Sequence, residues 1–171
     1  VEVLEVLARA HLTTTELRAA REEATRGLRL ARQIGDSLYE SLFLRTLVRV
    51  ADRTGAGLER ERLLREWGEL ARDPSHTELE EWWAWTQETV TWLIDEDHPE
   101  RALSFFKEAL FDRQEARGID PLSSPKLRRQ ARNLEATVLI RAGEFERAGA
   151  LLKSGITYND RSRLLRAYLG L

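Results

Sequence analysis

Apolar residues recur at steps of three and four along most of this chain, the spacing that places them on one face of a helix. Leu44, Leu47, Val48 and Ala51 follow it, and no stretch alternates as a half-buried strand does. Glycine, proline and short polar clusters interrupt the pattern. Between these interruptions it predicts nine helices, at residues 1–12, 14–34, 37–54, 57–72, 77–96, 99–117, 125–142, 144–154 and 160–170.

Several interruptions look like helix ends. The Thr-Thr-Thr-Glu run at 13–16 predicts a threonine cap for the second helix, and Asp36, directly after Gly35, predicts a cap for the third. Pro99 and Pro125 fit the first turn of a helix, where a missing N–H leaves no bond unmade. An all-α fold follows.

A ladder of residues at i, i+4 and i+7 recurs in every second predicted helix. Its first set is Ala20, Ala24 and Gly27. The later sets are Arg60, Leu64 and Trp67, then Ala102, Phe106 and Ala109, then Ala148, Leu152 and Gly155, and they begin 40, 42 and 46 residues after one another. A helical unit of about 40 residues is typical of an α-solenoid, in which each helix pair buries its apolar stripe against the next.

We therefore expect a single domain over residues 1–171, an α-solenoid of antiparallel helix hairpins. Because the chain has no methionine, even at position 1, we expect it to be a fragment of a longer protein. The ladder divides the domain into about four repeats followed by a terminal helix, at 1–35, 36–74, 77–118, 125–156 and 160–170.

The repeats resemble the tetratricopeptide repeat (TPR) family, whose units carry a small residue and an aromatic or Leu in helix A, a turn glycine, and Ala, aromatic and Ala in helix B. The third unit matches over 99–109, and the junction at 30–36 is similar to the 40-residue variants of kinesin light chains and of bacterial signalling and transcription regulators. The second unit departs, with Arg60 in an Ala position, and HEAT-type repeats are the alternative architecture. The best match is Ala136, Leu139, Gly143, Phe145, Ala148 and Leu152.

Composition limits the partners and the location. A net charge of −2 argues against general attraction to nucleic acid or to an anionic membrane. No apolar run reaches the roughly 18 residues of a membrane span, and the start has no signal-peptide character, so we expect a cytoplasmic protein. The absence of Cys excludes disulfides and Cys-ligated zinc. Lysine supplies only 3 of the 27 Lys and Arg residues, which is typical of GC-rich bacterial genomes, with heat tolerance as a second explanation.

The resemblance implies a partner-binding groove lined by the A helices. Arg45, Arg49 and Arg53 form one stripe at i, i+4 and i+8 in any register, and arginine forks suit carboxylates and phosphates. An acidic segment or a chain-terminal carboxylate is the expected ligand. The alternative is an ordinary solvated face. The other predicted groove residues are Leu42 and Asp52 in the same helix, and Gln130, Asn133, Thr137 and Arg141 in helix 125–142.

Four of the five tryptophans fall in helix 77–96. Trp85, Thr89 and Trp92 match the large-small-large packing positions of a TPR A helix. Trp82 and Trp83 are adjacent, about 100° apart around the helix, so we expect one of them, taken as Trp83, to reach the groove or a partner. Stacking on bases beside Arg is a further possibility.

We expect no catalysis, cofactor or metal in this segment. His98 follows three acidic residues, but no second pair of ligands stands at helical spacing elsewhere. The chain has no Cys nucleophile, no Gly-rich phosphate loop after a strand and no Gly-x-Ser-x-Gly. Ser123 and Ser124 lie in a loop with no recognisable base.

The expected function is a non-catalytic scaffold or sensor module of a larger, bacterial regulatory protein, which binds a protein, a peptide or its own neighbouring domains in the arginine-lined groove. Two alternatives remain open. The solenoid could sense a small ligand, a nucleotide, a sugar or single-stranded RNA. It could also space or dimerise an effector domain through a terminal helix.

Overall fold

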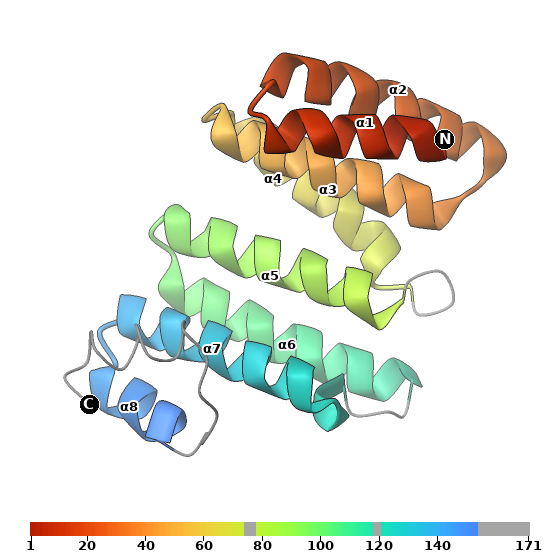
Figure 1. Cartoon of the computed structure of the whole chain (residues 1–171). Helices are drawn as coiled ribbons and strands as arrows, with labels where there is room; N and C mark the ends of the chain where they lie inside the picture. Colours follow the sequence, from red (N-terminus) through yellow and green to blue (C-terminus); the bar gives the residue numbers. More distant parts are fainter. Residues whose placement is uncertain (74–77, 118–120, 154–171) are drawn as a thin grey trace. The chain divides into compact units, whose positions relative to one another are not determined.

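Helices make up nearly all of the described structure (Figure 1). The computed structural model describes residues 1–73, 78–117 and 121–153, and these contain no strand, which confirms the all-α prediction. The helices are α1 (Glu2–Thr13), α2 (Leu17–Ile34), α3 (Ser37–Arg53), α4 (Gly57–Ala71), α5 (Leu79–Asp95), α6 (Pro99–Arg117), α7 (Pro125–Arg141) and α8 (Phe145–Lys153), with a 3-10 turn, η1 (Pro121–Ser123), before α7.

The first eight predicted helices are present, with ends within about three residues of those expected. α6 and α7 begin at Pro99 and Pro125 as predicted. Gly35 ends α2 in the left-handed region with φ 70°, and the Tyr39 N–H donates to Asp36 Oδ1 at 3.1 Å, which confirms the cap of α3. The predicted helix 160–170 lies outside the described residues.

The predicted threonine cap of α2 is wrong. α1 continues to Thr13, and the hydroxyls of Thr13 and Thr14 donate backwards to the carbonyls of Arg9 and Ala10. Thr15 then adopts a left-handed conformation with φ 66°, and α2 begins at Leu17. Threonine hydroxyls that find a carbonyl one turn earlier no longer serve the following helix.

The chain divides into two compact units, Val1–Trp85 and Thr86–Leu171. The boundary falls inside α5. In the first unit each of α1, α2 and α3 packs on the next helix, and α1 also contacts α3. In the second unit α6 packs on α7 and α7 on α8, while η1 contacts both α6 and α7.

The described members of the repeat ladder are buried without exception, as a shared packing face requires. They come from α2, α4, α6 and α8, the second helices of the predicted hairpins. Even Arg60, in the Ala position of the second unit, is buried, and its Nη1 lies 2.8 Å from Asp52 Oδ1. Gly155 lies outside the described residues.

Two glycines let neighbouring helices approach closely. A Cβ on Gly27 of α2 would lie 2.2 Å from the Phe43 ring of α3, and one on Gly68 of α4 would lie 2.8 Å from the Trp85 ring of α5. The missing side chain at Gly68 also lets Trp85 Nε1 donate to the Leu64 carbonyl at 3.0 Å. Each glycine is therefore a seat for an aromatic ring of the following helix.

We expect Gly27→Ala to lower the free energy of unfolding by about 1–3 kcal/mol, because the added methyl overlaps a fully buried ring. In an open helix the same change would stabilise by about 1 kcal/mol. Urea unfolding followed by circular dichroism measures the difference. Combining Gly27→Ala with Phe43→Leu should restore part of the lost stability. A Gly27→Ala variant as stable as the wild type would show that the Phe43 ring does not need the glycine.

Candidate functional site

The predicted arginine stripe lies on one side of α3 and is tied to the helices beside it. Arg45 Nη1 stands 3.3 Å from Glu81 Oε1 of α5, and Arg53 Nη1 donates to the Leu12 carbonyl at the end of α1 at 2.5 Å. Arg49, half-buried between them, also has an interaction partner. The stripe thus links α3 to the start of α5 and to the end of α1.

Arg45 belongs to a buried polar chain that joins three helices. Trp67 Nε1 of α4 donates to Ser41 Oγ of α3 at 2.6 Å, and the Ser41 hydroxyl donates to Glu81 Oε2 of α5 at 3.3 Å. Glu81 is only 9% exposed, so the Arg45 guanidinium offsets a charge that would be costly to bury alone. These hydrogen bonds could not be predicted from sequence spacing, because the bonded partners are 26 and 40 residues apart.

The two ends of α3 differ in electrostatic character. Partial burial, followed by the nearby carboxylates of Glu2, Asp36 and Glu5, raises the pKa of Tyr39 above its ordinary value of 10.0. Acidic residues thus gather near the N-terminal end of α3, whereas Arg45, Arg49 and Arg53 lie along its middle and C-terminal end.

Trp82 and Trp83 are both buried, at 2% and 4% exposure, so the prediction that one of them must point outward is wrong. Residues 81–86 of α5 are all buried. The 100° separation implies an outward-facing residue only where one side of a helix is exposed, and six consecutive residues are buried here. The two indole rings lie against each other, 6.1 Å between centroids and tilted by 47°.

Trp85 has the packing role expected of it. Its ring rests on Gly68, its N–H bonds the Leu64 carbonyl, and the Arg72 guanidinium lies 5.2 Å from its ring centroid, in cation–π range. Thr89 is buried as well, whereas Trp92 is only partly buried.

The predicted groove residues of α7 lie in the second unit. Asn133 is buried, Gln130 and Thr137 are half-buried, and Arg141 is exposed. The Thr137 hydroxyl donates to the Asn133 carbonyl at 2.8 Å. Gln130 Oε1 is buried and has no hydrogen-bond partner among the described residues. These residues share one helix, and their grouping with the α3 stripe stays a prediction.

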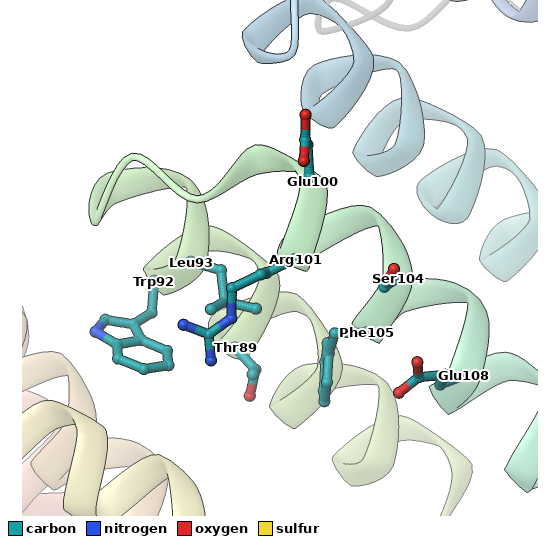
Figure 2. A pocket seen from close by; sticks show the side chains of 8 residues that line it. All are labelled: Thr89, Trp92, Leu93, Glu100, Arg101, Ser104, Phe105 and Glu108. Atoms are coloured by element: carbon teal, nitrogen blue, oxygen red, sulfur yellow. The ribbon is translucent and has the colours of Figure 1, made fainter.

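A pocket of about 530 Å³ lies between α5 and α6 in the second unit (Figure 2). That volume is within the range of small-ligand sites. Its lining combines aromatic, hydroxyl and charged side chains. The lining residues are Thr89, Trp92 and Leu93 of α5 and Glu100, Arg101, Ser104, Phe105 and Glu108 of α6.

Figure 2 shows the Arg101 side chain reaching from α6 towards Trp92 and Thr89 of α5. Thr89 is 8% exposed, and its hydroxyl has no hydrogen-bond partner within the described part of the chain. A guanidinium donates and cannot accept, so Arg101 cannot take the Thr89 proton. The place where these groups meet therefore suits a ligand that brings an acceptor.

The pocket was not predicted from the sequence, although a signal was present. Arg101, Phe105 and Glu108 each stand one position ahead of the three ladder residues of α6. They therefore form a second stripe beside the buried one, and its arginine, aromatic ring and carboxylate all line the pocket.

Within residues 1–73, 78–117 and 121–153, no group of three or more His, Cys, Asp or Glu is placed to hold a metal ion. Over the same ranges no helix combines the length and apolar character needed to cross a membrane.

Comparison of the chain with protein-family models, with curated proteins and with solved structures gives no match. The resemblance to TPR proteins stays a prediction from the residues quoted above. The function proposed below rests on this chain's own side chains.

We expect Ser41→Ala to lower the free energy of unfolding by about 1–3 kcal/mol, because the buried Trp67 N–H loses its acceptor and Glu81 loses a donor. Urea unfolding followed by tryptophan fluorescence measures this loss. Ser104→Ala, at an exposed position of α6, is the matched control and should leave the midpoint unchanged. Equal midpoints for both variants would show that the buried hydrogen bonds of Ser41 contribute nothing to stability.

Proposed function

We propose that this chain is a non-catalytic binding module of TPR-like helical repeats within a larger bacterial, cytoplasmic regulatory protein. The burial of the repeat ladder and the packing of successive helices support the repeat architecture. The partner is a protein or peptide that lies along the odd-numbered helices of the first unit. It presents an acidic segment or a terminal carboxylate to the arginine stripe of α3.

The observation that carries this proposal is the partial engagement of that stripe. Arg45 contacts Glu81 through Nη1 and Arg53 contacts the Leu12 carbonyl through Nη1, and a guanidinium has five N–H donors. One bond at each end fixes the side chains and leaves donors for a ligand. Such preorganisation lowers the entropic cost of binding.

Charge reversal at the middle of the stripe tests the groove. Arg49→Glu should weaken binding of fluorescein-labelled acidic peptides by about tenfold or more, because one charge-assisted bond is worth about 1.5–3 kcal/mol. Fluorescence anisotropy measures the affinity. Arg45 is left intact, since its loss would leave buried Glu81 unpaired.

Arg29→Glu is the control, because Arg29 is an exposed arginine of α2 and the charge change is the same. It should bind like the wild type. Peptides with free and amidated C-termini separate a terminal carboxylate from acidic side chains as the group recognised. If no peptide binds, or both variants lose affinity equally, the groove proposal fails.

The pocket between α5 and α6 favours a second candidate function, the sensing of a small ligand. Trp92 and Phe105 offer rings for a planar group, and Arg101 offers donors for a phosphate or carboxylate. Glu100 and Glu108 leave the lining with one net negative charge. A ligand of low charge, such as a nucleoside monophosphate, suits it better than a triphosphate.

Titration with nucleoside monophosphates, followed by tryptophan fluorescence, tests this second function. Arg101→Gln should abolish any response of the wild type, whereas Lys107→Gln, an exposed cation of the same helix outside the pocket lining, should retain it. A flat wild-type response at millimolar ligand would exclude nucleotide sensing at this pocket.

A further inference from the structure

The outer face of α1 is apolar and exposed. Val3 is 70% exposed, Val6 and Leu7 are also exposed large apolar residues, and Ala10 is exposed beside them. They stand at i, i+3, i+4 and i+7, so they form one stripe. The opposite side of the helix, with Ala8 and Leu12, is buried in the first unit.

The 40-residue register shows what this stripe is equivalent to. The offset that takes Ala20 of the ladder to Arg60 takes the four exposed residues of α1 to four positions of α3. All four of these α3 residues are buried. They are Phe43, Thr46, Leu47 and Val50.

The preceding helix pair covers these positions of α3. Phe43 rests on Gly27 of α2, and Val50 packs in a buried cluster with Leu12 of α1 and Ala20 of α2. The α1–α2 pair therefore covers this face of α3, whereas none of the described residues covers the equivalent face of α1. The exposed stripe of α1 therefore has the spacing and apolar character of a helix face that is buried between successive repeats.

We propose that this face of α1 is a docking surface for one more helix pair of the same repeat type, held as α1 and α2 are held against α3. The docking pair would have a first helix that ends in a leucine, as α1 does. Its second helix would carry Ala or Gly at i, i+4 and i+7, as α2 does. The inference rests on the repeat architecture proposed above and not on the arginine groove.

Two arguments favour this occupant over a second copy of the chain. The surface continues an interface that the first unit already contains, with the same spacing. The described ladders of the chain are already buried, so a second copy has no free small-residue face among its described residues to offer.

The chain has no cysteine, so a single introduced thiol can report whether the stripe is covered. Val6→Cys is made in the full chain and in the same chain carrying a second copy of residues 1–40 ahead of Val1. In the extended protein Val1 follows the added Glu40 directly, as Ser41 follows Glu40 in the original chain. The 40-residue register is therefore kept. The rate of reaction with a thiol reagent is then measured in both proteins.

The extension should slow labelling of the Val6→Cys thiol by about tenfold or more, because thiol reactivity depends on access. Leu58→Cys, at an 87% exposed position of α4, should label at the same rate in both proteins. As a second readout, Val6→Asp should lower the urea midpoint of the extended chain and leave that of the unextended chain unchanged.

Equal labelling of the Val6→Cys thiol with and without the extension would overturn the proposal. So would a dimer of the unextended chain in analytical ultracentrifugation that dissociates on Val6→Asp, because the occupant would then be a second copy. Neither measurement involves the acidic peptides, so a failed groove and a failed docking surface give different results.

Discussion

The close approach of successive helices in the first unit depends on two glycines, each facing an aromatic ring. Gly27 admits Phe43, and Gly68 admits Trp85. The second contact brings the Trp85 N–H to a helix carbonyl and places the start of α5 against α4. With α5 held there, Glu81 reaches Ser41 and Arg45. The packing of rings on bare backbone thus determines where the buried polar chain can form.

The arginine stripe has a structural and a proposed binding role, and the two are linked. Arg45 neutralises a buried carboxylate, and Arg53 donates to the Leu12 carbonyl at the end of α1, which also accepts the Thr15 N–H. Bonds of this kind hold long side chains that would otherwise lose rotamer freedom on binding. A surface that binds anions with these residues is consequently as rigid as the helix layer that it ties together.

Local patterns predicted the local structure apart from the threonine cap of α2, and they failed where contacts came from distant residues. The helices, the Asp36 cap, the first-turn prolines and the buried ladder each depend on spacing within a few residues. The burial of Trp82 and Trp83 depends on what surrounds α5, which helical periodicity cannot show. Sequence reasoning did not single out Glu81, because its partners Ser41 and Arg45 lie 40 and 36 residues earlier. The pocket could not be predicted because its lining comes from both α5 and α6, and sequence spacing does not show how two helices pair.

The contact between Gly27 and Phe43 couples the two positions as evolutionary partners. A methyl added at Gly27 alone meets the intact ring at 2.2 Å, and a smaller residue at Phe43 alone leaves a cavity. Either single change costs stability, whereas a larger residue at one position can be offset by a smaller residue at the other. The two positions should therefore vary as a pair and not independently.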